Sequence, residues 1–277
     1  MRASGAWVSI RVHPGSNRDA VLAALFESGA QGVQELDDNL LTHVQGEPAA
    51  EALICAILAA SPDARVDSVP LVDVDWAETW KRNVRVQNVG NLIIAPPWLA
   101  DEFDGARTIV IEPAMAFGTG DHASTRGVMR LMQSVVHAGD RVADLGAGSA
   151  VLSIAAAKLG ARYAAAVEID ADAIGNAQEN VRRSGAGEQV VVIEGDAGRL
   201  LPLVAPVRVV LANIISSVLV ELLPVIASAL EADGRAILGG MLVSERQEMI
   251  DAFTSAGWRV ENEDSEDGWW STTIARR

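Results

Sequence analysis

The chain has 277 residues and a formal net charge of −15, and hydrophobic residues make up 49% of it. This length favours about two domains, and this composition is typical of a folded protein rather than a disordered one. A single cysteine excludes an internal disulfide, and the four histidines are scattered, so the sequence predicts no metal site. A surface this acidic repels nucleic acid and favours basic partners.

Two features of the sequence bear on location. The N-terminus lacks the basic, apolar and small-residue segments of a signal peptide. The longest apolar region, residues 207–230, is interrupted by polar side chains and by Pro224, which favours a strand followed by a helix over a membrane span. We therefore expect a cytoplasmic protein, monomeric, without direct contact to nucleic acid or membrane.

Residues 1–72 are expected to form a small domain of their own. Strands are predicted at 7–12, 31–36, 40–44 and 65–72, and helices at 16–28, with Ser16 as the cap, and at 47–60. The resulting order β-α-β-β-α-β is that of the ferredoxin-like motif. Because this segment has no glycine loop and no polar cluster, we expect it to serve recognition or packing rather than to carry the chemistry.

Residues 73–105 are expected to form a linker that carries tryptophans. Trp76 and Trp80 are four residues apart and would share one face of a helix. Trp98 follows Pro96 and Pro97, and the two prolines exclude a continuous helix there. Such a tryptophan stripe favours packing over catalysis.

From residue 106 to residue 277, predicted strands alternate with predicted helices. Strands are expected at 108–112, 142–145, 164–169, 190–194, 208–213 and 235–240, and helices at 123–137, 149–159, 171–184, 216–230 and 244–256. Residues 258–262 and 271–275 are expected to close the chain as an antiparallel pair. This alternation predicts an α/β fold with a mainly parallel, doubly wound sheet.

A glycine turn lies between the strand at 142–145 and the following helix. Gly146 and Gly148 allow the backbone to approach a ligand closely, and the helix N-terminus offers unpaired N–H groups. In the dinucleotide-binding fingerprint a small residue would follow, where this chain has Val151. Asp144, just before the turn, suits a cationic sulfonium better than a pyrophosphate. The turn therefore favours S-adenosylmethionine over NAD.

Two further acidic residues follow the next two predicted strands. Glu168 comes 22 residues after Gly146, where a carboxylate accepts hydrogen bonds from ribose hydroxyls. Asp196 follows the strand after that and is placed to accept a hydrogen bond from an adenine amino group. Together with Asp144 these acids support a cofactor site at the ends of three strands.

Residues 112–125 carry a far more specific pattern. Their sequence, E-P-A-M-A-F-G-T-G-D-H-A-S-T, resembles the D-P-G-x-A-F-G-T-G-x-H-x-T-T signature of the PrmA family, and residues 209–214 resemble its V-x-A-N-I segment. The resemblance covers nearly the whole chain. It implies a seven-stranded S-adenosylmethionine-dependent methyltransferase fold and methylation of lysine and N-terminal amines of large-subunit ribosomal protein eleven, a basic partner.

The resemblance also assigns roles to individual residues. Cofactor contacts fall on Thr125, Gly146, Glu168 and Asn213, which adds Thr125 and Asn213 to the residues already selected. Asn213 would orient the acceptor amine, and Phe117 with the segment around Thr119 would exclude water. We expect His122 to order this loop rather than to act as a base. The predicted site is thus Thr119, Thr125, Asp144, Gly146, Gly148, Glu168, Asp196 and Asn213 for the cofactor, with Asn213 and Phe117 catalytic.

The chain departs from the family pattern at several positions. Glu112 and Ala114 replace an aspartate and a glycine, Ala150 replaces the last glycine of the turn, and Glu168 stands for the usual aspartate. Three other functions remain open: a lysine methyltransferase of another protein, such as an electron-transfer flavoprotein subunit, an NAD-dependent oxidoreductase, and a non-catalytic scaffold that binds the cofactor. Asp144 and Val151 disfavour the oxidoreductase.

Overall fold

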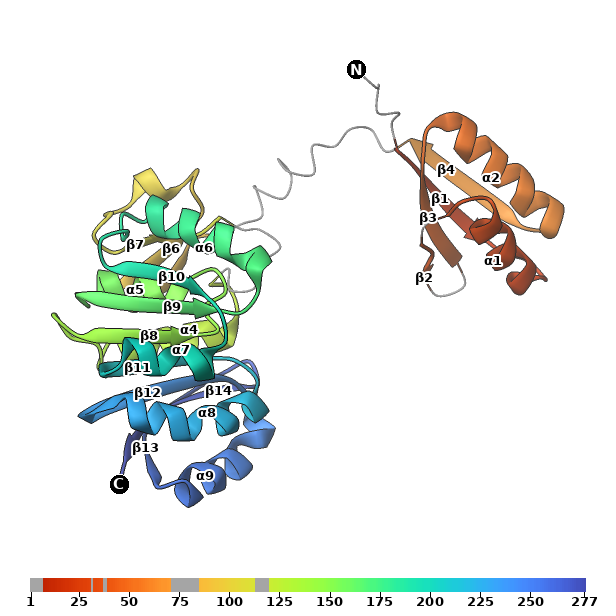
Figure 1. Ribbon diagram of the computed structural model, residues 1–277. Coiled ribbons are helices and arrows are strands. Elements are labelled where there is room, and N and C mark those ends of the chain that lie inside the picture. The colour runs from red at the N-terminus through yellow and green to blue at the C-terminus, as the bar shows by residue number, and fades with distance from the viewer. Residues whose placement is uncertain (1–6, 31, 37–38, 71–84, 113–119) are drawn as a thin grey trace. The chain divides into compact units, whose positions relative to one another are not determined.

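The computed structural model describes residues 7–30, 32–36, 39–70, 85–112 and 120–277. The chain divides into two compact units, residues 1–84 and 85–277 (Figure 1). The predicted boundaries at residues 72 and 105 differ from this division, because residues 85–105 pack as part of the second unit. Residues 73–84, with Trp76 and Trp80, lie outside the described residues.

The first unit is an antiparallel sheet with two helices. Its strand order is β2-β3-β1-β4, and the side chains of Val8, Ile10 and Val12, at alternate positions of β1, share one apolar core with α1 and α2. The order of elements is the predicted one, and the ferredoxin-like assignment stays a prediction. The elements are β1 (Trp7–His13), α1 (Arg18–Glu27), β2 (Gln34–Leu36), β3 (Asn39–Gln45), α2 (Glu47–Ala60) and β4 (Arg65–Pro70).

The predicted cap of the first helix is wrong. Asn17 is the N-cap of α1, and its side-chain oxygen accepts a hydrogen bond from the Ala20 N–H at 3.3 Å. The Ser16 N–H instead donates to the Asp63 carboxylate at 2.8 Å. An asparagine caps a helix as well as a serine does, so composition alone could not decide between two neighbouring residues.

The second unit is built on a seven-stranded sheet of order β10-β9-β8-β11-β12-β14-β13. The strands from β10 to β12 run parallel, and β14 runs antiparallel to both its neighbours, as the alternation of elements and the closing pair predicted. The strands are β8 (Arg141–Leu145), β9 (Tyr163–Glu168), β10 (Val190–Glu194), β11 (Val207–Asn213), β12 (Leu230–Leu242), β13 (Trp258–Glu266) and β14 (Trp269–Arg276).

Helices cover both faces of this sheet (Figure 1). One apolar core joins one face to α4, α5 and α6, and a second core joins the other face to α7, α8 and α9. Strand order reverses between β8 and β11, and ligands of open α/β sheets bind outside the carboxyl ends of the strands at such a point. The helices are α4 (Ala123–Met132), α5 (Val151–Lys158), α6 (Ala171–Arg183), α7 (Ala197–Val204), α8 (Ser216–Ala229) and α9 (Arg246–Ser255).

Some elements differ from the prediction. The structure adds α7, which the sequence interpretation did not contain, and ends α4 at Met132 instead of His137. A small sheet precedes the large one and is formed by β5 (Gln87–Val89), β6 (Leu92–Ala95) and β7 (Thr108–Val110). Its strands β5 and β6 therefore lie within the segment predicted to be a linker.

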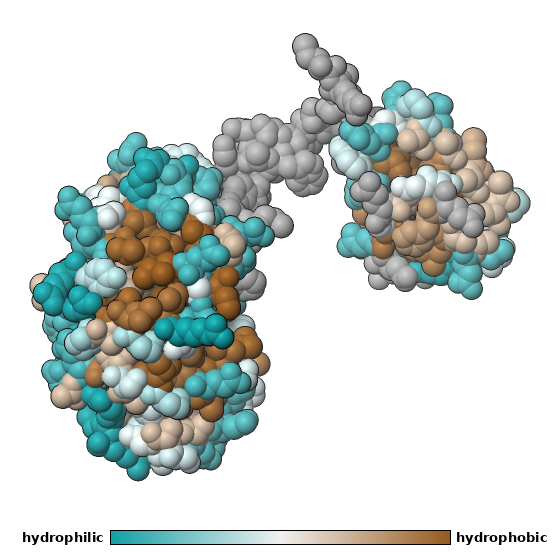
Figure 2. Space-filling model, viewed as in Figure 1, coloured by the Kyte–Doolittle hydropathy of each residue, from teal (hydrophilic) through white to brown (hydrophobic). Residues whose placement is uncertain are grey.

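The surface of the second unit is mixed in polarity. On the face drawn in Figure 2, hydrophobic surface is visible over β10 and α7, the elements that carry exposed Val191 and Leu203. Throughout the described ranges, no helix is long and apolar enough to span a membrane.

Candidate active site

A cavity of about 450 Å³ opens at the carboxyl ends of β8, β9 and β11. A second cavity, of about 540 Å³, adjoins it and shares Gly146, Ile169 and Ile214 with it. Both volumes are in the range of small-molecule sites. The first is lined by His122, Ser124, Thr125, Gly146, Ala147, Gly148, Val151, Leu152, Glu168, Ile169, Asn213, Ile214, Ile215, Gly240 and Trp269.

The glycine turn forms one wall of the first cavity. Gly146 and Gly148 have φ of +71° and +51°, a region that side chains disfavour. The N–H groups of Gly146 and Ala147 both donate to the Val167 carbonyl, at 2.9 and 3.0 Å, which holds the turn against β9. A Cβ on Gly146 would lie 2.5 Å from Ile214 Cγ2. The turn therefore needs glycine both for its backbone and for its space.

Ala150, where the family pattern has glycine, adopts φ of +64° as the N-cap of α5. A left-handed conformation costs a non-glycine residue roughly 1–2 kcal/mol. This departure from the pattern therefore places backbone strain at the N-terminus of α5.

Glu168 lies at the end of β9 and faces the glycine turn. One carboxylate oxygen accepts from the Gly148 N–H at 2.7 Å, and the other accepts from the Asp170 N–H at 2.9 Å. Each oxygen can accept more than one hydrogen bond. The buried carboxylate is therefore fixed in place and still able to accept from ligand hydroxyls.

Asp144 is placed differently from the expectation of a direct cofactor contact. Its side chain is wholly buried, does not line either cavity, and accepts from the Ser153 N–H and hydroxyl through Oδ2 at 3.0 and 2.7 Å. Oδ1 has no hydrogen-bond partner among the described residues. Burial, with a smaller contribution from Glu168, raises the pKa of Asp144 to about 7 against the opposing effect of Ser153. Its influence on a ligand is therefore through its charge.

Thr125 and Asn213 meet at the far wall of the first cavity. The Asn213 side-chain amide donates to Thr125 Oγ1 at 3.1 Å, across 88 residues of sequence. Asn213 Oδ1 is buried and, among the residues that the structure describes, has no partner. A buried acceptor without a partner is costly, so this oxygen is suited to a donor supplied by a ligand.

The remaining predicted residues are distributed around this centre. Asp196 is the exposed N-cap of α7, accepts from the Arg199 N–H at 3.0 Å, and lines the second cavity. Phe117 and Thr119 lie outside the described residues, so their roles stay predictions. The structure thus brings Thr125, Gly146, Gly148, Glu168 and Asn213 to one cavity and Asp196 to its neighbour.

Sequence reasoning missed Trp269. It begins β14, lines the first cavity, and packs against His122, with ring centroids 4.6 Å apart and planes at 68°. His122 Nδ1 is 2.7 Å from Ser124 Oγ, so the histidine is held by both neighbours. No local pattern predicts this contact, because it depends on β14 lying beside β12 in the sheet.

The buried side chain of Asn180 joins the cavity wall to the segment before residue 113. Its Oδ1 accepts from the Glu112 N–H at 2.9 Å, and its Nδ2 donates to the Ser149 carbonyl at 3.1 Å and to Asn176 Oδ1 at 2.6 Å. Its exposed fraction is 0%. One amide on α6 therefore connects the glycine turn to the chain that follows β7.

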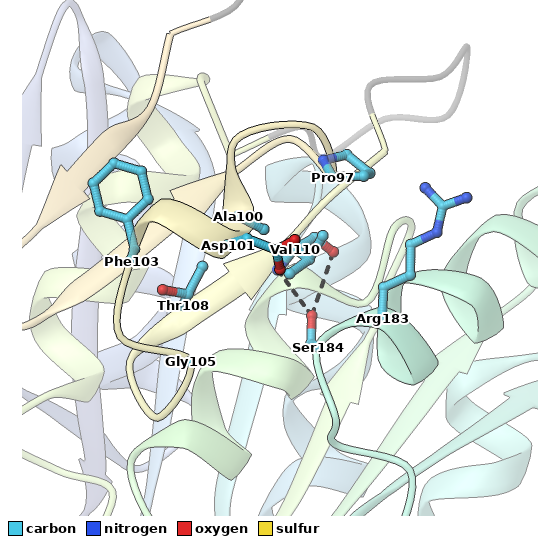
Figure 3. A pocket seen from close by; sticks show the side chains of 9 residues that line it. All are labelled: Pro97, Ala100, Asp101, Phe103, Gly105, Thr108, Val110, Arg183 and Ser184. Atoms are coloured by element: carbon cyan, nitrogen blue, oxygen red, sulfur yellow. Dashed lines mark hydrogen bonds between the residues drawn. The ribbon is translucent and has the colours of Figure 1, made fainter.

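Beside these contacts lies a third cavity, of about 510 Å³ (Figure 3). Two of the polar side chains that line it, Ser184 and Arg183, have partners in the protein. Ser184 Oγ accepts from the Val110 N–H at 2.9 Å, and Arg183 pairs with Glu112 and Glu179. Throughout the described residues, no three His, Cys, Asp or Glu side chains are placed to hold a metal ion.

Comparisons with known proteins identify the family. The family described as "Ribosomal protein L11 methyltransferase (PrmA)" matches residues 49–277. Proteins named ribosomal protein L11 methyltransferase include one from Thermus thermophilus, 34% identical over 91% of this chain and 92% of its own length, and one from Myxococcus xanthus, 32% identical over 93% and 94%. A third, from Symbiobacterium thermophilum, is 37% identical over 70% of this chain, which spans 64% of that relative.

A solved structure agrees with these relatives. It is titled as a ribosomal protein L11 methylase from Lactobacillus delbrueckii subsp. bulgaricus, and it is 26% identical with a TM-score of 0.63, covering 70% of this chain and 100% of its own. The doubly wound, seven-stranded fold and the family resemblance predicted from the sequence are both confirmed. The chain belongs to the PrmA family.

Proposed function

We propose that this chain binds S-adenosylmethionine and transfers its methyl group to lysine side chains, and to an N-terminal amine, of ribosomal protein L11 in the cytoplasm. The observation that carries the proposal is Asn213 Oδ1, a buried acceptor without a partner among the described residues, beside a cavity walled by the glycine turn. The names of the relatives supply the substrate. The first unit, which carries none of the site residues, is proposed to hold the substrate protein.

The residues present fit S-adenosylmethionine. Glu168 would accept from the ribose hydroxyls, and the second cavity, with Asp196 and Ile169, would hold the adenine. The amino-acid part of the cofactor would lie along the glycine turn towards Thr125. The bound cofactor supplies an activated methyl group on a positively charged sulfur, so the protein has only to position the acceptor.

Asn213 suits the acceptor amine. An amine attacks only through its neutral form, and an apolar wall lowers the pKa of a lysine by penalising its charge. Ile214, Ile215 and Trp269 provide such a wall, and Asn213 Oδ1 would accept one amine N–H. No separate base is needed when the amine loses its proton on entering the site.

Incubation with labelled S-adenosylmethionine and purified ribosomal proteins tests the proposal. We expect label on lysines of ribosomal protein L11. Asn213→Ala should lower turnover roughly 100-fold, as the loss of one positioned polar group does in other active sites, and this loss should exceed the loss in affinity for S-adenosylhomocysteine. A chain lacking residues 1–70 should bind the cofactor product and lose protein methylation.

Other outcomes of this assay identify the alternatives. Label on another protein only, such as an electron-transfer flavoprotein subunit, would replace the proposed substrate. Calorimetric binding of NAD and not of S-adenosylmethionine would support the oxidoreductase, and cofactor binding without any methylation would support the scaffold. Full turnover by Asn213→Ala would show that the proposed role of Asn213 is wrong.

Asp144 gives the site an expected dependence on pH. Its carboxyl group, with a pKa of about 7, becomes negative as the pH rises from 6 to 8. That charge favours the cationic sulfur of S-adenosylmethionine over the neutral sulfur of S-adenosylhomocysteine. The ratio of the two affinities, measured by calorimetry, should therefore rise several-fold over this range. Asp144→Asn should give a ratio that does not change with pH. A constant ratio in the unmodified protein would contradict the proposed effect of the Asp144 charge on the cofactor sulfur.

A further inference from the structure

We propose that Ile215, Leu242, Val243 and Glu245, here called the apolar rim, bind a second lysine or arginine of the substrate polypeptide close to the acceptor amine. The aliphatic stem of that side chain would lie on the three apolar residues, and its charged end would pair with Glu245. The inference rests on the proposed function, since it takes a protein amine as the acceptor.

The rim lies next to the mouth of the first cavity. Asn213 and Gly239 are register partners in the neighbouring strands β11 and β12, so the residues that follow them share one edge of the sheet. Ile215 comes two residues after Asn213 and itself lines the cavity. Leu242, at the end of β12, is paired with Trp269, which also lines the cavity.

Hydrogen bonds hold the rim together around one carboxylate. Glu245 accepts from the Ser216 hydroxyl at 2.6 Å and from the Leu242 N–H at 2.7 Å, which ties the end of β12 to the start of α8. The Val243 N–H donates to the Gly268 carbonyl at 2.9 Å. The bonds from Ser216 and from Leu242 lower the pKa of the Glu245 carboxyl group. The group is therefore charged at neutral pH, and it keeps lone pairs for a further donor.

The apolar side chains of the rim are open to solvent. Ile215, Leu242 and Val243 are 65%, 43% and 45% exposed. Adjacent exposed aliphatic residues beside a ligand cavity mark a binding surface more often than a single exposed residue does. A carboxylate among apolar neighbours is also less screened by water than one on an open polar surface.

A basic side chain is the occupant that fits both the exposed aliphatic residues of the rim and the Glu245 carboxylate. Lysine and arginine lay their aliphatic stems along apolar surface and direct the charged end to a polar partner. A lysine stem spans roughly 6 Å, so an acceptor lysine inserted to Asn213 leaves its neighbours in sequence near the mouth of the cavity. The net charge of −15 gives the chain a general attraction for such a basic partner.

The test uses the full-length protein and intact ribosomal protein L11. Glu245→Gln removes the charge; its Oε1 can still accept from the Leu242 N–H, and its Nε2 would donate to the Ser216 hydroxyl, which reverses that bond. Leu242→Ser and Val243→Ser shorten the apolar surface. Leu203→Ser is the matched control, because Leu203 is 77% exposed and adjoins Val204, whose carbonyl contacts Arg141 at the opposite, amino edge of the sheet. Thermal unfolding verifies that each variant is folded.

Each rim variant should raise the KM for the protein substrate at least fivefold and leave the KM for S-adenosylmethionine within twofold. The effect of Glu245→Gln should shrink as salt is added, because screening weakens the ion pair. Replacing the basic residues that flank the acceptor lysine of the substrate should weaken binding to the unmodified protein and not to Glu245→Gln. Leu203→Ser should change neither KM.

Two results would overturn the assignment of the rim. One is an unchanged protein KM in all three rim variants, and the other is an equal rise in both KM values, which would place the rim in the cofactor site. These results differ from failure of the proposed function, in which the unmodified protein itself would not methylate L11. In that case the rim has no such substrate to hold, and the inference falls with the function.

Discussion

Replacing Gly146 with alanine is expected to lower the affinity for S-adenosylhomocysteine at least tenfold. The new Cβ would lie 2.5 Å from Ile214 Cγ2, and Ile214 lines both cavities. The clash is relieved only by moving Ile214 or the turn, and either movement reshapes the cavity wall. Because φ at this position is +71°, an alanine there also lowers the free energy of unfolding by roughly 1–2 kcal/mol.

Gly185→Ala separates the two effects. Gly185 has a similar φ of +64°, and a Cβ built on it meets no atom within 4 Å. In denaturant titrations Gly185→Ala should therefore lose only the backbone contribution to stability, whereas Gly146→Ala should lose more because of the clash with Ile214. Only Gly146→Ala should lose affinity in calorimetry. Equal affinities for the two variants would show that the space at Gly146 is not part of the ligand site.

The sequence was most informative where structure is determined locally. Strands buried on both faces, such as β9, are continuous apolar runs, and the strand-turn-helix around Gly146 placed Gly148 and Glu168 at the cavity. The helix α7 was not predicted, because Gly198 and Pro202 within it lower its apparent helix propensity. Its place is decided by packing of Leu201 in the second apolar core.

Contacts across the fold were beyond local patterns. Local spacing predicted that the Asp144 carboxylate contacts the ligand. In the structure it is buried and accepts two hydrogen bonds from Ser153 of α5 instead. The contact of Asn213 with Thr125 spans 88 residues and was not predicted. The resemblance to the family only assigned each of the two residues to the cofactor. Trp269 reaches the cavity because β14 inserts between β12 and β13, which no spacing in the chain encodes.

Replacing Asn180 with aspartate is expected to weaken binding of S-adenosylhomocysteine at pH 8. Binding should recover as the pH falls. An ionised carboxylate can still accept from the Glu112 N–H, but its other oxygen would face the Ser149 carbonyl and Asn176 Oδ1 without a proton to donate. An uncompensated buried charge costs about 3–5 kcal/mol. Because Ser149 follows Gly148 in the turn, affinity for S-adenosylhomocysteine should fall together with stability.

The pH dependence of Asn180→Asp has a definite sign. Burial raises the pKa of the new carboxyl group in the folded state above its unfolded value of about 3.9. The free energy of unfolding of the variant therefore falls as the pH rises from the unfolded pKa to the folded pKa. Below the folded pKa, the protonated carboxyl group donates to the Ser149 carbonyl as the amide does. The ratio of variant to unmodified affinity, measured from pH 5 to pH 8, should rise towards low pH. Asn180→Ala is the control, because it has no group to titrate and should give a reduced ratio that does not change with pH. A ratio that is also constant for Asn180→Asp would mean that the bond to Ser149 does not set the geometry of the turn.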